Sequence, residues 1–201
     1  INYEDLANDV WKDKVVIRSS SNMYNQSLVS SLISNLGIDQ TEKWAKDFVA
    51  NFARKPQGND RSQIMAVANK EASIAIANTY YIGIMLSGKG GELQLDAAQK
   101  VKIAFPNQTN RGAHINISGA AVVKHSKNIN NAIKLIEYLA SKKAQELYAK
   151  ANHEYPIRGN IEVSETVKSW GYPFRQDSLS LNELGKNNTK AVEIFDRVNW
   201  Q

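Results

Sequence analysis

Strand-like and helix-like segments alternate along this chain, and that alternation limits the possible folds more than any other feature of the sequence. Residues 15–17 form a short β-branched run ending at Arg18, and a polar loop then leads into apolar residues at helical spacing from Leu28 to Leu36. Residues 73–77 have the pattern of a second, buried strand. Repeated strand–loop–helix units predict an α/β layered structure.

Two further helices are expected from capping signals in the first third of the chain. Residues 39–42 have the spacing of a capping box, which predicts a helix that buries Trp44 and its neighbours at helical spacing. Asp60, followed by Gln63 three residues later, predicts the start of the next helix. Both helices would lie between the two strands in sequence, as an α/β structure requires.

The second half of the chain is expected to contribute two more strands and three helices. Residues 101–105 alternate as a strand does, and residues 115–123 have a similar pattern. Two helices then follow back to back, the first over residues 132–139 and the second capped by Ser141. A last helix is expected near residues 192–198, after a loop-rich stretch.

Composition excludes several classes of protein. No apolar run approaches the ~20 residues that a membrane-spanning helix needs. The 25 basic residues are interleaved with 20 acidic ones, so the net charge of +5 indicates a solvated surface and no nucleic-acid partner is expected. The absence of cysteine rules out disulfides, thiolate metal sites and cysteine nucleophiles. No hydrolase, zinc or dinucleotide motif is present, so we do not expect an enzyme.

The adjacent residues Tyr80 and Tyr81 are the best indication of function. They follow the second expected strand at the point where a helix is expected to begin, and Asn78 or Thr79 can act as its N-cap. Neighbouring side chains on a strand point to opposite faces, whereas consecutive residues at a helix start diverge by only ~100°. Both hydroxyl groups can therefore reach one cleft.

Five segments of the chain carry a resemblance to a known family, in order and with family-like spacing. They are residues 18–27, 52–61, 77–81, 105–108 and 116–119. Together they resemble the bacterial ferric-iron-binding proteins of the FbpA/FutA type, the periplasmic substrate-binding components of ABC transporters. The resemblance implies a class II periplasmic-binding-protein fold, here mainly the C-terminal lobe plus part of the N-terminal lobe.

The resemblance further implies that Tyr24, Tyr80 and Tyr81 are metal ligands for Fe³⁺. A small, hard, highly charged cation is suited to anionic oxygen ligands. A free phenol with a pKa of ~10 is protonated at neutral pH, but a bound trivalent cation stabilises the phenolate and drives the proton off. Binding of the metal should therefore release protons and weaken in acid.

An anion such as carbonate can complete the metal coordination in some relatives, while others do without one. The simplest role for residues 19–22 is to cap the helix that follows them. Free backbone N–H groups at that helix start would also attract a small anion. The candidate anion-binding residues are Ser19, Ser20, Ser21, Asn22 and Asn78. Asp60 stands where some relatives carry an Asn that contacts the anion, and its carboxylate would repel an anion. A site with a bound anion and a site without one therefore both remain open.

The resemblance also implies a division of the chain between two lobes. Residues 1–112 would form the C-terminal lobe with the tyrosine site, residues 113–161 would belong to the N-terminal lobe, and residues 162–201 would return to the C-terminal lobe. The rest of the N-terminal lobe, which supplies further ligands in family members, is expected to be absent from this chain. None of the three histidines has ligand spacing, and loop or surface roles are expected for them.

The function that these expectations imply is capture of ferric iron in the periplasm by hinge closure, followed by delivery to an inner-membrane permease, with no reaction catalysed. The alternative is a binding protein of the same fold for another solute, either an oxyanion or an organic cation.

Overall fold

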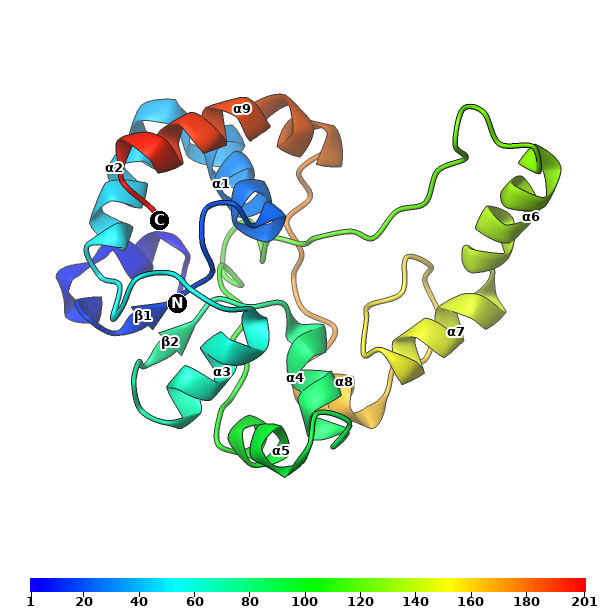
Figure 1. Ribbon diagram of the computed structural model, residues 1–201, viewed down its shortest axis with the longest axis horizontal. Helices are drawn as coiled ribbons and strands as arrows, with labels where there is room; N and C mark the ends of the chain where they lie inside the picture. The colour runs from blue at the N-terminus through cyan, green and yellow to red at the C-terminus, as the bar shows by residue number, and fades with distance from the viewer. The chain divides into compact units, whose positions relative to one another are not determined.

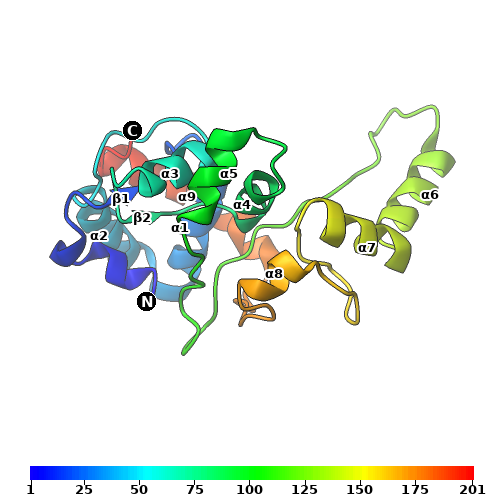
Figure 2. The same ribbon diagram turned by 90° about the horizontal axis from the view of Figure 1, so that it is seen from below.

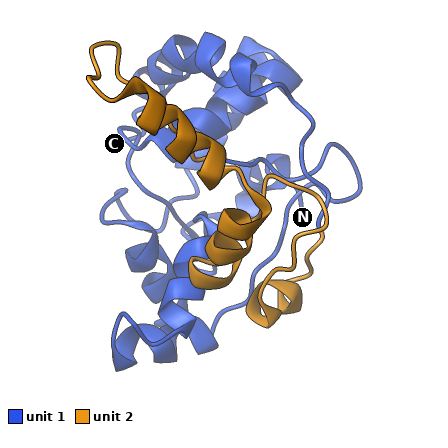
Figure 3. Ribbon diagram, turned by 90° about the vertical axis from the view of Figure 1, so that its right-hand side faces the viewer, with its two compact units in different colours: residues 1–116, 174–201 blue, residues 117–173 orange.

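The structure of the protein, a computed structural model, describes all residues from 1 to 201 (Figure 1). The chain divides into two compact units, which Figure 3 colours separately. Unit 1 comprises residues 1–116 and 174–201, and unit 2 comprises residues 117–173. None of the helices combines the length and the apolar content that crossing a lipid bilayer requires.

Unit 1 contains short 3-10 helices, a small sheet and most of the α-helices. The 3-10 helices are η1 (Glu4–Ala7) and η2 (Asp9–Trp11), and the strands are β1 (Val15–Val16) and β2 (Ile74–Ala75). The α-helices of unit 1 are α1 (Met23–Leu36), α2 (Ile38–Val49), α3 (Asp60–Ala68), α4 (Thr79–Leu86), α5 (Glu92–Gln99) and α9 (Leu181–Arg197). Those of unit 2 are α6 (Ile129–Leu139), α7 (Lys142–Ala151) and α8 (Glu165–Ser169).

The two strands of unit 1 pair in parallel, with Val15 opposite Ile74 and Val16 opposite Ala75. Phe52 forms an additional parallel bridge to Val15. Neighbouring parallel strands end at the same edge of a sheet, so the loop before α1 and the start of α4 emerge side by side. The sheet thus brings together two segments that are far apart in the sequence.

The main core of unit 1 lies between α1, α2 and α9, which pack against one another (Figure 1). Its centre is Trp200, which is fully buried. The Trp200 ring contacts Phe195 at 4.8 Å between ring centroids and also lies against Trp44, Phe48 and Phe52. Buried aromatic rings contribute a large apolar area and favour edge-to-face or offset contacts, so this cluster fixes the three helices firmly. The expected helices with Leu28 and Trp44 on their buried faces are confirmed.

Helices α3, α4 and α5 form a second group of unit 1, in which each contacts the other two (Figure 2). Helix α3 also packs on both strands, where Ala66 and Ala72 are buried with Val16. Because α4 carries the tyrosine pair, this group determines how the pair is held.

Unit 2 has a much smaller core. It consists of Ala149, Ile161, Val163 and Val167, with aromatic side chains packed against them. Helix α7 begins as expected, because the Ser141 side chain accepts a hydrogen bond from the backbone N–H of Ala144. Helix α6 precedes it, also as expected, but buries none of its residues.

The sequence predicted more strand than the structure contains. Residues 101–105 and 115–123 form no strand, although their alternating pattern predicts one. A strand needs a neighbouring strand for its ladder of backbone hydrogen bonds, and the one sheet contains only β1 and β2. The apolar residues find other contacts or stay exposed: Phe105 stacks on Phe174 with ring centroids 4.0 Å apart, and Val123 is exposed. The strand expected over residues 73–77 is present as β2 but is shorter and only half-buried.

The predicted capping box over residues 39–42 is wrong. Helix α2 begins at Ile38, directly after Gly37, so all four of those residues lie inside the helix. Gly37 has a φ of 83°, a conformation that glycine adopts without strain, and this permits α1 and α2 to be joined by this one residue.

The cap of α3 is also shifted from the prediction. Helix α3 begins at Asp60 as expected, but its capping box consists of Asn59 and Ser62, one residue earlier than the predicted pair of Asp60 and Gln63. The Ser62 N–H donates to Asn59 Oδ1 at 3.1 Å. The Asp60 carboxylate is therefore not used as the N-cap and can interact elsewhere.

Candidate metal centre

Tyr24 lies in the first turn of α1, close to the end of β1. Its backbone N–H donates to Asn22 Oδ1 at 3.1 Å, so Asn22 is the N-cap, as one of the four polar residues over 19–22 that the sequence offers for this role. The preceding loop is held by the next residue of the helix, because the buried Asn25 amide donates to the carbonyl oxygens of Arg18 and Ser19 at 2.7 and 2.9 Å. These bonds fix where α1 begins and hence where the Tyr24 side chain starts.

Tyr80 and Tyr81 lie in the first turn of α4, which begins at Thr79. Asn78 occupies the N-cap position, as one of the two expected candidates, but its side chain makes no capping hydrogen bond. Its side-chain oxygen instead accepts from the amide of Asn116 at 2.9 Å, and its backbone N–H donates to Asp60 at 2.9 Å. The start of α4 is thus held by residues outside the helix.

The three tyrosines come together from α1 and α4, and Tyr24 and Tyr80 are 56 residues apart in the sequence. The hydroxyl oxygens of Tyr24 and Tyr80 are 3.1 Å from each other, and the rings of Tyr80 and Tyr81 stack with centroids 4.2 Å apart. All three side chains are half-buried, so solvent reaches them. The arrangement offers a cluster of oxygen donors that is open to an incoming ion.

The electrostatic surroundings keep Tyr80 and Tyr81 neutral. Burial raises the pKa of both phenols above its ordinary value, and hydrogen bonds with Tyr24 and with each other also act on it. For Tyr80 these hydrogen bonds raise the pKa further. Each of the two phenols therefore retains its proton at neutral pH unless a strongly charged cation replaces it.

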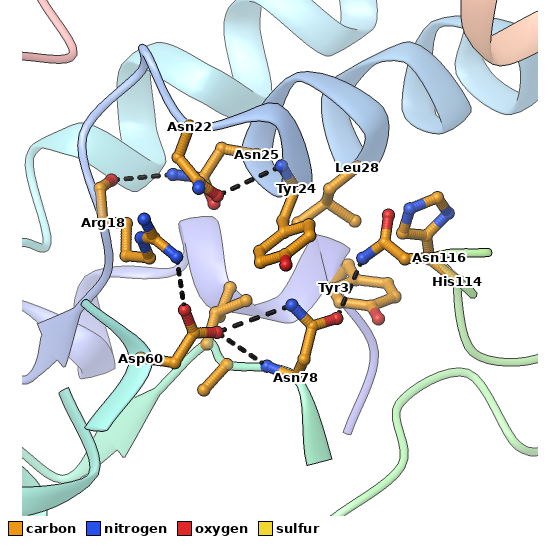
Figure 4. A pocket seen from close by; sticks show the side chains of 12 residues that line it. Tyr3, Arg18, Asn22, Tyr24, Asn25, Leu28, Asp60, Asn78, His114 and Asn116 are labelled. Atoms are coloured by element: carbon orange, nitrogen blue, oxygen red, sulfur yellow. Dashed lines mark hydrogen bonds and ion pairs between the residues drawn. The ribbon is translucent and has the colours of Figure 1, made fainter. Parts of the chain in front are cut away.

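A pocket of about 70 Å³ lies beside this cluster, and Tyr24 forms part of its wall (Figure 4). The other polar residues that line it are Tyr3, Arg18, Asn22, Asn25, Asp60, Asn78, His114 and Asn116. No group of three or more His, Cys, Asp or Glu side chains forms a metal-binding cluster anywhere in the protein. The tyrosines remain the candidate ligands that the resemblance implies.

Two of the residues that line this pocket form an ion pair. Arg18 Nη1 lies 2.6 Å from Asp60 Oδ2, and the Asp60 side chain is only 2% exposed. Figure 4 shows the Arg18 and Asp60 side chains pointing toward each other, with Arg18 beside Tyr24. The expectation that Asp60 caps its own helix with Gln63 is wrong, and this ion pair is the role that the carboxylate has instead.

Residues 2–175 match the model of a family described as bacterial extracellular solute-binding protein. The chain belongs to this family.

Several relatives of this solute-binding protein have names that refer to iron. Iron uptake protein A1 of Synechocystis sp. is 46% identical over 199 residues, which cover 99% of this chain and 55% of the relative. A solved structure titled as Trichodesmium IdiA (FutA) in complex with iron and citrate ligands is 47% identical, with a TM-score of 0.93 over 100% of this chain and 63% of that one. The ferric binding protein from Campylobacter jejuni gives 40% identity, a TM-score of 0.95 and the same coverage.

These comparisons confirm the predicted resemblance to ferric-binding proteins of the FbpA/FutA type. They also confirm the predicted fold. The chain contains only part of that fold, since it spans about half the length of the curated relatives it matches. The solute-binding protein is thus a member of a family of transport proteins. The roles of individual residues, including the candidate anion-binding ones, stay predictions.

Two pocket residues could not have been found from the sequence. His114 was expected to have a loop or surface role, and it does lie in a loop, but its side chain lines the pocket and its Nε2 is 2.9 Å from Ser27 Oγ. Burial lowers its pKa to about 4, so the imidazole is neutral at pH 7. Tyr3 lies against the same pocket, and burial raises its pKa. Neither residue belongs to a motif, and their neighbours are distant in the sequence.

Proposed function

We propose that this protein is the ferric-iron-binding component of an ABC transporter and that Tyr24, Tyr80 and Tyr81 bind Fe³⁺ as phenolates. The observation that carries the proposal is the 3.1 Å separation of the Tyr24 and Tyr80 hydroxyl oxygens. Adjacent oxygens around a small octahedral cation bound at about 2.0–2.1 Å lie roughly 2.9 Å apart. The two oxygens therefore need little movement to occupy neighbouring coordination positions.

The chemistry of the phenols favours a trivalent ion. Because the pKa values of Tyr80 and Tyr81 are raised, a weakly polarising cation would not displace their protons. Fe³⁺ is hard and highly charged, and three phenolates would balance its charge. Binding would release protons, so affinity would fall as the solution becomes more acidic.

The proposal extends to how the whole protein works. Unit 1 would be most of the lobe that carries the tyrosines, and unit 2 would belong largely to the opposite lobe. Unit 2 spans residues 117–173, whereas the segment expected to belong to the opposite lobe is 113–161. Closure of the lobes would add ligands to the iron and exclude water, and the closed form would then deliver it to a permease in the inner membrane. The protein would act in the periplasm and catalyse no reaction. The name of a relative from Serratia marcescens, Fe(3+)-binding periplasmic protein, supports this location.

The proposal is tested by adding ferric citrate to the full-length protein and recording its visible spectrum. We expect a phenolate-to-iron charge-transfer band that is lost when Tyr80→Phe and Tyr81→Phe are combined. A matched control combines Tyr138→Phe and Tyr148→Phe, which removes two hydroxyl groups from exposed tyrosines of unit 2 and should leave the band intact.

A band that persists in the Tyr80→Phe and Tyr81→Phe variant would refute the ligand assignment. If no band forms and the protein instead binds an oxyanion or an organic cation, the alternative solute class replaces iron.

A further inference from the structure

We propose that Arg18 and Asp60 are positioning residues for the metal site, and that their ion pair couples the tyrosine of α1 to the tyrosine pair of α4. This inference rests on the proposed function, since it concerns the same phenols.

The Asp60 carboxylate connects two segments through its two oxygens. Oδ2 accepts from Arg18 Nη1 at 2.6 Å, and Oδ1 accepts from the backbone N–H of Asn78 at 2.9 Å. Figure 4 shows both contacts meeting at this one side chain. Arg18 follows β1 and Asn78 follows β2, so a single carboxylate joins the segments that emerge from the two paired strands.

On the side of α1, Arg18 is held at both its backbone and its side chain. Its carbonyl oxygen accepts from the Asn25 amide at 2.7 Å and from Trp200 Nε1 at 3.3 Å. Its guanidinium carbon lies 5.7 Å from the centroid of the Tyr24 ring, which is a cation–π contact. The arginine therefore restrains the Tyr24 ring.

On the side of α4, Asp60 fixes the residue from which the helix starts. Tyr80 and Tyr81 follow Asn78 by two and three residues in the first turn of α4. The Asn78 side chain makes no capping bond, so the bond from its backbone N–H to Asp60 is a main restraint on where α4 begins. A shift of Asn78 would move both phenols together.

Stability alone is a weak reason for such a pair. Removing two charges from water costs several kcal/mol, and apolar residues of similar size often serve a fold equally well. Metal sites, in contrast, depend on outer residues that orient their ligands. The location of this pair, between the two elements that carry the phenols, points to orientation.

The test compares Asp60→Asn, Arg18→Met and Arg18→Lys in the full-length protein. Iron affinity is measured by competition with citrate, and the charge-transfer band is recorded, at a temperature where every variant is folded. Asp60→Asn and Arg18→Met should lower the affinity by about 10- to 100-fold and change the wavelength or intensity of the band. Arg18→Lys keeps the charge and should lose less than Arg18→Met.

The control is Glu71→Gln, although the Glu71 side chain is 44% exposed and that of Asp60 only 2%. Glu71 pairs with Arg54 at 2.6 Å, and the Arg54 side chain is 20% exposed, close to the 24% of Arg18, but this pair touches none of the tyrosines. Its loss should leave the affinity and the band unchanged, whatever it does to the melting temperature.

The inference is overturned if Asp60→Asn and Arg18→Met bind iron with the affinity and the band of the unmodified protein, even when their melting temperatures fall. That result would leave the proposed function standing if the combined Tyr80→Phe and Tyr81→Phe variant still loses the band. Persistence of the band in that tyrosine variant would instead reject the proposed function. Should Asp60→Asn fail to fold, the comparison of Arg18→Met with Glu71→Gln decides.

Discussion

Units 1 and 2 differ in how completely they cover their own apolar residues. In unit 1, helix α1 buries seven of its residues, and the core that it shares with α2 and α9 is closed around Trp200. In unit 2, helix α6 buries none, and Ile129, Ile133, Leu135 and Tyr138 are between 43% and 57% exposed. An amphipathic pattern thus predicts a helix in both units, but burial of that helix depends on a partner that the pattern does not specify.

The difference explains why the candidate site lies in unit 1. A cluster of phenols can bind an ion only if its backbone is held within a fraction of an ångström of the required geometry. Helix α1 is fixed by a large aromatic core, and the start of α4 is fixed by Asp60. Unit 2 has only a small core and offers no comparable framework.

The largest effect should come from the centre of the main core. Trp200→Ala removes a fully buried ring that contacts four other aromatic side chains, and we expect it to lower the free energy of unfolding by about 3–5 kcal/mol. Leu135→Ala in unit 2 truncates a side chain that is mostly exposed, so the change should stay within about 0.5 kcal/mol. Urea denaturation of both variants measures this, and equal losses would contradict the contrast between the units.

The buried ion pair should give the next largest effect. Asp60→Ala leaves the Arg18 guanidinium and the Asn78 N–H without their partner, and we expect a loss of about 3 kcal/mol, at the low end for buried pairs because Arg18 is partly exposed. Chemical denaturation at neutral pH is the measurement. A loss below about 1 kcal/mol would mean that water replaces the carboxylate easily.

Acid should destabilise unit 1 through His114. Its pKa is about 4 in the folded protein and near 6.5 when unfolded, so the unfolded state takes up a proton first as the pH falls. The stabilisation is complete above pH 6.5 and is lost between pH 6.5 and 4, by up to about 3 kcal/mol. Denaturation of the metal-free protein across this range measures it.

His114→Asn should flatten that decrease, because the substituted side chain does not titrate. His125→Asn changes an exposed histidine of unit 2 and should leave the acid profile as it was. An unchanged profile in His114→Asn would show that His114 is not buried as described.

The smallest effect should come from a surface pair in unit 2. Lys142 and Glu146 approach to 3.8 Å across one turn of α7, with 72% and 39% of their side chains exposed. Lys142→Ala should change the free energy of unfolding by less than about 0.5 kcal/mol, since solvent screens such pairs. A larger loss, measured by the same denaturation, would indicate that α7 is held more tightly than its burial suggests.

Local signals in the sequence predicted a good part of this protein. Ser141 was predicted as a cap, and Asn22 was one of four candidates, because the bonds that caps make reach only a few residues ahead. Tyr80 and Tyr81 were placed at a helix start for the same reason, and the meeting with Tyr24 came from the resemblance to a family. Local signals were not always right, since the capping boxes expected over residues 39–42 and at Asp60 were misplaced.

Contacts between distant residues were not predictable in this way. Arg18 and Asp60 are 42 residues apart, and Ser27 and His114 are 87 residues apart, so no spacing rule connects them. Residues 101–105 have the alternating pattern of a strand but form none, because no neighbouring strand pairs with them. The tertiary fold alone determines such partners.

The central claim is that three phenol oxygens converge on one ferric ion. Crystals of the full-length protein loaded with iron, measured at the iron absorption edge, test it most directly. We predict one anomalous peak within bonding distance of the hydroxyl oxygens of Tyr24, Tyr80 and Tyr81. An iron peak elsewhere, with the hydrogen bond between Tyr24 and Tyr80 still in place, would contradict the account.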